Sequence, residues 1–441
     1  MYGANKSVLQ LGLYQFQHAD TPTYIIGLDN KEQCMDSKTA DSLWKLLKSA
    51  IQQIQKKHHS NLNFEELYRY GYYLVMHKHG SLLYSGLRDV ISQHLRSKVQ
   101  CKVLANLNSN FLHVINNSWD HHLDCINMIR DILMYMDRVY VKQNGLDDIY
   151  TLGLNLFKTQ VVCFDSIQHF LQSTLLGMVD RERSGELVDR NAFRRATRML
   201  MVLGNHSPAV YQQTFEEPFL QQSANYFRTE SQQLLEENNA SVYLRRTESC
   251  VSEELERAEQ CFDEQTLHKI ANVINDELIR PHMKTVAEMN SSGVVHMIEF
   301  QQTEDLACMY KLYARVPDGL KTMFNIISQY LREQGRIIIS DDRQDNDNDA
   351  LVYIQNLLDL KDKIDFYLIN SFSNDKHCKQ MVAADFEHIL NLNPKYPEYL
   401  SLFIDDKLKK TVKTMTDSDK GVLLDKTMVL FRFLQDKDLF E

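Results

Sequence analysis

Glycine and proline are scarce in this chain, which has 15 glycines and 7 prolines among 441 residues. Together they reach about half of their usual share in globular proteins. Glycine is too flexible to favour a helix, and proline lacks an amide hydrogen and clashes with the preceding helical turn. A chain that uses so few of them favours long helices joined by short loops. Because no run of about 18 apolar residues occurs, we expect no membrane span.

Length, charge and cysteine usage narrow the class of protein. The length suggests roughly two to four domains, or one extended array of repeats. The net charge of −10 disfavours nucleic acid as a partner, since that would call for a basic face. The N-terminal residues do not form a secretory signal. The eight cysteines have no CxxC spacing and are typical of free thiols in a reducing compartment, so we expect the protein in the cytoplasm and nucleus.

Apolar residues recur at helical spacing along most of the chain after residue 36. Asn63 and Glu66 have the spacing of a capping box at the start of a helix. In the helix expected over 42–55, one stripe is predicted to face the core: Leu43, Leu46, Leu47, Ile51 and Ile54. Further helices are predicted over 81–98, 102–118 and 124–142. Helix stops are predicted at Asn144-Gly145, Ser184-Gly185, Gly204-Asn205, Ser292-Gly293 and Gly335, with a short strand at Arg336 to Ile339.

No motif in the sequence supports catalysis or metal binding. A calcium loop beginning at Asp345 would need glycine and glutamate where Ala350 and Asn356 stand, so 340–350 is expected to be an acidic loop that precedes a helix. The His77/His79 and His121/His122 pairs have spacings that put their side chains on different helix faces. Glycine-rich phosphate loops, GxSxG and HExxH are absent. We therefore expect no cofactor and no metal, and only a dispersed catalytic site stays open as the alternative.

The segment 61–90 carries more apolar surface than one helix face needs. Leu67, Leu74 and Val75 form a stripe that is predicted to face the core. Phe64, Tyr68 and Tyr72 form a second stripe at i, i+4 and i+8. Such a stripe indicates either deep burial or a partner surface, because tyrosine is enriched at interfaces, and geometry alone leaves both open.

A milder pattern lies in the helix expected around 126–141. Its predicted core stripe is Ile129, Ile132, Leu133, Met136 and Val139. Tyr135 and Arg138 lie off that stripe, three residues apart on an exposed face. A solvated arginine with a tyrosine at the rim would look like this, but both are also common interface hot-spot residues.

At these two helices the sequence resembles the cullins, the scaffolds of multisubunit ubiquitin ligases, and looks most like the subgroup that docks BTB-domain proteins. The resemblance covers roughly 35–441. The strings that carry it are FEELYR, LVMHKHG, LYSGLRDV, MIRDILMYMDRVYV, ASVYLRR, HMKTVAEMNSSGVVHM, TEDLACMYKLYARVPDGLKTM, YLREQG, ADFEHILNLN and PEYLSLFIDDKLKK.

The resemblance implies an all-α fold: an elongated stalk of three five-helix cullin repeats, followed by the first helices of a truncated C-terminal bundle. The implied boundaries are 1–36 for a flexible N-terminal extension, 37–160 for the first repeat, which binds the adaptor, 161–280 for the second, 281–395 for the third and 396–441 for the start of the bundle.

The implied function is that of a non-catalytic scaffold, whose N-terminal arm docks BTB-domain substrate adaptors for ubiquitin-dependent protein degradation. The alternative is a short decoy that sequesters BTB proteins without supporting ubiquitin transfer. Carried over from the family, the partner-binding positions are Leu62, Phe64, Glu65, Tyr68, Tyr72, Tyr135 and Arg138. They favour partner binding over burial for the second stripe.

Two departures from the family pattern bear on this function. Residues 1–34 do not resemble the extension that adds apolar contacts to the adaptor in the similar cullins, although Ile25, Ile26 and Leu28 are candidates for that role. The sequence also lacks the domain that holds the RING protein, so we expect that partner to bind only through a region absent here. Leu430, Phe431, Phe433 and Leu434 are then expected to lie exposed without their bundle partners and to favour self-association.

Small-angle scattering tests the expected architecture. A compact globule of this length would have a radius of gyration of about 22 Å. A rod of helical repeats should give a clearly larger value, because each repeat contacts only its neighbours along the chain. A measured radius close to that of the globule would contradict the repeat architecture.

Overall fold

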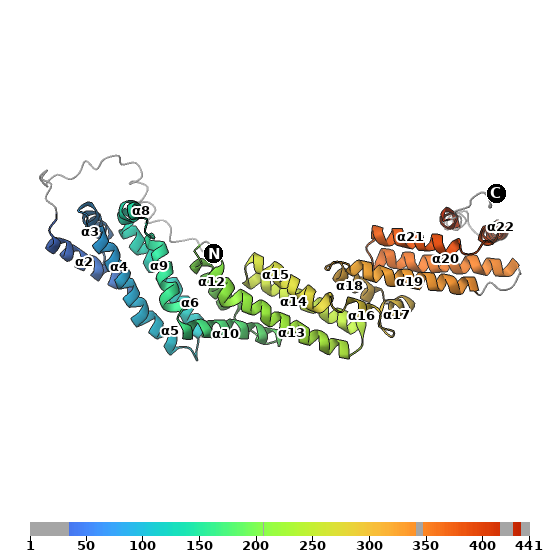
Figure 1. Cartoon of the computed structure of the whole chain (residues 1–441), viewed down its shortest axis with the longest axis horizontal. Coiled ribbons are helices and arrows are strands. Elements are labelled where there is room, and N and C mark those ends of the chain that lie inside the picture. Colours follow the sequence, from blue (N-terminus) through green and yellow to red (C-terminus); the bar gives the residue numbers. More distant parts are fainter. Residues whose placement is uncertain (1–34, 206, 341–346, 415–426, 434–441) are drawn as a thin grey trace. The chain divides into compact units, whose positions relative to one another are not determined.

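The computed structural model describes residues 35–205, 207–340, 347–414 and 427–433, with side chains described except at 347–349 and 408–414. Every regular element in these residues is a helix (Figure 1). None of the described helices is both long enough and apolar enough to cross a membrane. Packing divides the chain into two units, of which the first comprises the described residues up to Lys102 together with Ser118–Val161.

The first unit contains the segment with the second apolar stripe. In it α2 packs against α3 and α4, and α3 packs against α7. Its helices, including three that are shared with the second unit (α5, α6 and η3), are α2 (Ser37–Gln55), α3 (Phe64–Met76), α4 (Gly80–His94), η1 (Leu95–Gln100), α5 (Cys101–Ala105), α6 (Phe111–Ile132), α7 (Met134–Met136), η2 (Asp137–Val141), α8 (Lys142–Asn144), α9 (Ile149–Phe157) and η3 (Lys158–Val162), where η marks a π-helical stretch.

The second unit holds the remaining helices, and the division into repeats at 160, 280 and 395 stays a prediction. Its first helices are α10 (Asp165–Arg183), α11 (Arg190–Leu203), α12 (Ala209–Tyr211), η4 (Gln212–Glu216), α13 (Glu217–Glu236), α14 (Ala240–Cys261), α15 (Glu264–Ile274) and η5 (Asn275–Ile279). They are followed by α16 (Met283–Ala287), α17 (Val294–Glu299), α18 (Thr303–Tyr313), α19 (Gly319–Ser340), α20 (Asp347–Asn370), α21 (Lys376–Leu390) and α22 (Tyr396–Thr414).

Most predicted helix ends are confirmed by the backbone. Gly145 follows α8 at φ 60°, and Gly185 follows α10 at φ 85°, a left-handed conformation that glycine adopts without steric cost. The chain also leaves α11 at Gly204. The stop predicted at Ser292-Gly293 was wrong, because α16 already ends at Ala287 and Gly293 precedes the start of α17. Within 102–118 the prediction of one helix was wrong, because α5 ends at Ala105 and α6 begins only at Phe111.

The predicted stop at Gly335 and the strand at 336–339 were both wrong. The helix α19 runs through this segment to Ser340. A Cβ on Gly335 would lie 2.6 Å from Cγ2 of Ile389 on α21, so this glycine allows two helices to approach rather than ending one. Of the three isoleucines that suggested a strand, Ile338 and Ile339 pack partly buried against the core cluster as part of the helix, whereas Ile337 is 44% exposed.

The C-terminal apolar residues that are described are packed, contrary to expectation. Leu430 is fully buried in a cluster formed mainly by α20 and α22, and Phe431 and Phe433 are partly buried against the same cluster. The ring of Phe433 stacks on Phe386 at 6.3 Å between centroids. Leu434 lies outside the described residues, as do Ile25, Ile26, Leu28 and Asp345.

A buried ionic network ties α10 to α14 in the second unit. Arg183 donates from Nε to Glu254 at 2.7 Å, and Arg257 donates from Nε to Glu182 at 2.9 Å. The side chains of Arg183, Glu254 and Arg257 are only 3–4% exposed. Arg183 also reaches Ser223 on α13 at 2.8 Å. Each buried charge therefore has a partner, which is what keeps it tolerable away from water.

Removing the central carboxylate should destabilise the second unit strongly. Glu254→Ala removes the close carboxylate partner of the buried Arg183 and leaves Arg257 with Glu182 alone, and we expect a loss of about 3–5 kcal/mol of unfolding free energy. Glu253→Ala is the control, because its side chain is 51% exposed on the same helix and its loss should cost less than about 1 kcal/mol. Thermal and urea unfolding followed by circular dichroism measures both. Equal effects of the two substitutions would contradict a stabilising role for the network.

Candidate partner-docking surface

The helix α3 begins where the sequence predicts it. The side chain of Asn63 accepts a hydrogen bond from the backbone N–H of Glu66 at 3.3 Å, which satisfies one of the free donors of the first turn. The Glu66 side chain does not complete the capping box. It accepts a hydrogen bond from the hydroxyl of Tyr70 instead of from the backbone N–H of Asn63. The cap fixes Phe64 as the first helical residue. It therefore determines which side of α3 each of the two apolar stripes occupies.

The two stripes of α3 differ sharply in burial. Leu67, Leu74 and Val75 are at most 9% exposed, which confirms the predicted core stripe. On the second stripe, Phe64 and Tyr72 are partly buried and Tyr68 is 37% exposed. The second stripe is therefore a surface feature of the first unit, and the interpretation as core is wrong for Tyr68.

The helix expected over 124–142 is interrupted. The helix α6 ends at Ile132, and Leu133, at φ −106° and ψ 21°, leaves helical geometry before α7 begins. Tyr135 then lies on α7 and Arg138 on η2. Of the predicted core stripe, the first four members are buried and Val139 is only partly buried. Because of this break, the direction of the Tyr135 side chain does not follow from the helical spacing of the residues on α6.

Tyr135 completes the second stripe of α3 from a different element. Its ring lies 4.6 Å from the ring of Tyr72, centroid to centroid, with the planes tilted by 53°. Its hydroxyl donates to Sδ of Met76, the last residue of α3, at 3.0 Å. Phe64, Tyr68, Tyr72, Met76 and Tyr135 together are called the docking surface below. Met76 was not among the predicted positions, although it continues their spacing of four residues.

Gly71 lies where α3 packs against the break between α6 and α7. A Cβ at this position would lie 2.9 Å from Cδ2 of Leu133 and 3.7 Å from the carbonyl oxygen of Ile132. Real Cβ atoms avoid the shorter distance, so a larger residue at this position would require the Leu133 side chain to move. Glycine lets α3 pack here without displacing that side chain.

The remaining predicted positions lie at the edge of the docking surface. Glu65 is exposed and pairs with Arg69 at 2.5 Å on the same helix. Leu62 is partly buried just before α3. Arg138 is exposed, and no hydrogen bond or ion pair of its side chain occurs within the described part of the chain. Its guanidinium is therefore available for a carboxylate of a partner.

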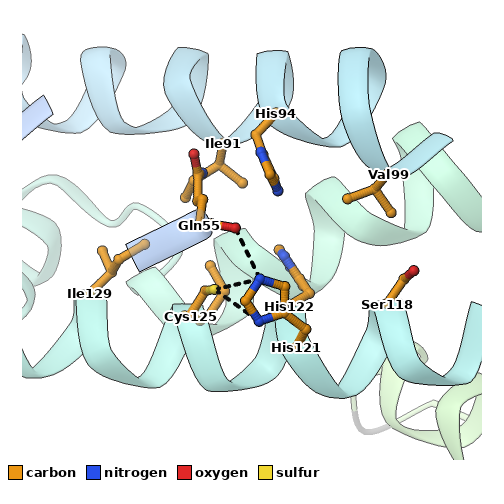
Figure 2. Close-up of a pocket in the computed structure, with 10 residues that line it drawn as sticks. Gln55, Ile91, His94, Val99, Ser118, His121, His122, Cys125 and Ile129 are labelled. Atoms are coloured by element: carbon orange, nitrogen blue, oxygen red, sulfur yellow. Dashed lines mark hydrogen bonds between the residues drawn. The ribbon is translucent and has the colours of Figure 1, made fainter. Parts of the chain in front are cut away.

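A second cluster of polar groups in the first unit lines a small cavity between α2, α4 and α6 (Figure 2). The cavity measures about 10 Å³, space for roughly one water molecule. His121 Nε2 lies 3.0 Å from the carbonyl oxygen of Gln55, and the sulfur of Cys125 lies 3.7 Å from the His121 ring nitrogens (Figure 2). His122 Nε2 lies 2.9 Å from the carbonyl oxygen of Gly153.

Burial governs the ionisation of this cluster. It lowers the pKa of His122 to about 4, although the hydrogen bond to Gly153 acts in the opposite direction. Burial also lowers the pKa of His94 and raises that of the Cys125 thiol to about 12. Among the described residues no group of three or more His, Cys, Asp or Glu side chains is placed to hold a metal ion. We interpret the cavity as part of the core, with His122 buried as a neutral ring and both histidines close to backbone carbonyls.

Comparison with known proteins decides the family. The family described as "Cullin alpha solenoid domain" matches residues 44–441. The chain is 44% identical over 398 residues to Cullin-3 of Dictyostelium discoideum, which covers 90% of this chain and 51% of the relative. It is 40% identical to Cullin-3A of Arabidopsis thaliana, with 92% and 55% covered. The chain belongs to the cullin family.

This cullin chain spans about half the length of the curated relatives it matches. Identity to Cullin-4A of Homo sapiens is lower, at 32% over 92% of this chain and 52% of the relative. The order of identities agrees with the resemblance to Cullin-3 proteins in particular. The predicted family and the all-helical solenoid fold are thereby confirmed.

The buried His122 should contribute a loss of stability to the first unit of this cullin as pH falls from about 6.5 to 4. Above about 6.5 His122 is neutral in both the folded and the unfolded state, and the full stability is present. Between about 6.5 and 4 the unfolded chain takes up a proton that the buried ring does not, which costs about 3 kcal/mol in all. Below the folded-state pKa of about 4 this loss is complete.

Urea unfolding followed by tryptophan fluorescence measures this effect, because the two tryptophans of the chain, Trp44 and Trp119, both lie in the first unit. His122→Gln can still donate to the Gly153 carbonyl but does not titrate. The difference in unfolding free energy between wild type and variant should therefore change with pH over this window. A constant difference would show that His122 is not held neutral.

Proposed function

We propose that this chain is the adaptor-docking arm of a ubiquitin-ligase scaffold, and that its docking surface binds BTB-domain substrate adaptors for ubiquitin-dependent degradation. Membership of the cullin family and the high identity to proteins named Cullin-3 support the scaffold role. The RING protein would bind a region outside this sequence. The chain itself would be non-catalytic, and it would act in the cytoplasm and nucleus.

One observation carries the choice of the docking surface. Phe64, Tyr68 and Tyr72 share one face of α3, the ring of Tyr135 from α7 contacts Tyr72, and Tyr68 is 37% exposed. A folded protein gains little by exposing such rings, whereas a partner gains apolar area from them. The hydroxyl of an exposed tyrosine can bond to water while the partner is absent, which makes tyrosine suited to a surface that is used part of the time.

The charged edge supports a partner of defined orientation. Arg138 is exposed three residues after Tyr135, and Glu65, which pairs with Arg69, is exposed next to Phe64 in the sequence. Flanking charges of this kind contribute more to orientation and association rate than to affinity. We therefore assign the affinity to the rings and the orientation to Glu65 and Arg138.

Tyr68→Ala should weaken binding of a purified BTB domain by about tenfold or more, because truncating an interface hot spot costs roughly 2 kcal/mol or more. Tyr135→Ala should weaken binding to a similar degree. The melting temperature of Tyr68→Ala should change little, since an exposed ring contributes little to the fold. Isothermal calorimetry and thermal melting measure the two effects.

Tyr70→Ala is the matched control, because it removes the same side chain two residues away on the same helix but off the second stripe. It should bind the BTB domain like the wild type. Normal binding by Tyr68→Ala would mean that the docking surface is not the site. A large fall in melting temperature for Tyr68→Ala would instead mean that the ring stabilises the fold.

A further inference from the structure

The docking surface extends one helical turn beyond the positions that the family resemblance implies. Phe64, Tyr68, Tyr72 and Met76 follow one another at intervals of four residues and share one face of α3. Met76 is 52% exposed, more than Tyr68. The thioether at the end of the stripe is therefore the most accessible apolar side chain on this face.

Met76 is joined directly to a residue of the proposed docking surface. The hydroxyl of Tyr135 donates to its sulfur at 3.0 Å, while the ring of Tyr135 contacts Tyr72. Tyr135 therefore lies between the ring of Tyr72 and the thioether of Met76. A partner that covers the hydroxyl end of Tyr135 also meets Met76.

The backbone ends the surface at this point. His77 caps α3, and Lys78 adopts a left-handed conformation at φ 65° that turns the chain towards α4. The backbone N–H groups of Lys78 and His79 bond back to Val75 and Leu74 at 3.1 and 2.8 Å, which fixes the turn. Met76 is consequently the last apolar contact that this face of α3 offers.

We propose that Met76 is a contact residue of the docking surface, and that BTB-domain adaptors present an apolar side chain or pocket to it. This inference rests on the proposed function. Methionine is unbranched and polarisable, so its side chain adapts to differently shaped apolar surfaces. Such adaptability suits a scaffold that receives several adaptors through one site.

Three variants test the contact in calorimetry with a purified BTB domain that binds the wild type. Met76→Ala should weaken binding at least about fivefold, the loss typical of an interface residue above 1 kcal/mol. Met76→Leu keeps the apolar area and should bind within about twofold of the wild type. Met428→Ala removes a methionine of similar exposure, 48%, in the second unit and should bind normally. Melting temperatures of all three should match the wild type.

The outcomes separate this inference from the proposed function. Normal binding by Met76→Ala, together with loss of binding by Tyr68→Ala, would overturn the role of Met76 and leave the docking surface intact. Equal losses for Met76→Leu and Met76→Ala would also overturn the contact role, because the sulfur would then act only by holding Tyr135. A wild-type chain that binds no BTB domain would overturn the proposed function and this inference with it.

Discussion

The packing of α3 against α7, just beyond the break at Leu133, is the constraint on which the docking surface depends. Gly71 faces Leu133 at this point, where a Cβ would lie 2.9 Å from the leucine Cδ2. Where the two elements pack, the rings of Tyr72 and Tyr135 meet, and the hydroxyl of Tyr135 reaches the sulfur of Met76. This packing joins residues about sixty positions apart in the sequence into a single surface.

Polar groups in the interior are accommodated in two different ways. In the first unit His122 is buried as a neutral ring that bonds to a helix carbonyl, and burial holds its pKa low. In the second unit Arg183, Glu254 and Arg257 are buried as charges and compensate one another. Both solutions avoid an isolated buried charge. Because each requires particular neighbouring helices, both make the packing of their unit specific.

Helical periodicity predicted most elements, because a stripe of apolar residues can be recognised in the sequence without knowing which distant residues it contacts. The same reasoning failed where a distant contact decides the outcome. Leu46 was assigned to the core stripe of α2 but is 52% exposed. Periodicity shows which residues share a helix face, but not how much of that face the neighbouring helices cover. Gly335 stays within α19 because of Ile389, more than fifty residues later. Met76 could have been found from its spacing alone, whereas its bond to Tyr135 could not, because the break at Leu133 leaves no clear signal in the sequence.

The break at Leu133 means that the docking surface is not the property of any single helix. A synthetic peptide that copies α3 would carry Phe64, Tyr68, Tyr72 and Met76 but would lack the ring that packs on Tyr72. Without the contacts of Tyr135 to Tyr72 and Met76, those side chains would not be held in one arrangement, and the peptide would bear the cost of ordering them on binding. A competitor of adaptor docking would therefore have to reproduce α3 together with the turn from α6 into α7, as a folded miniature rather than as a linear epitope.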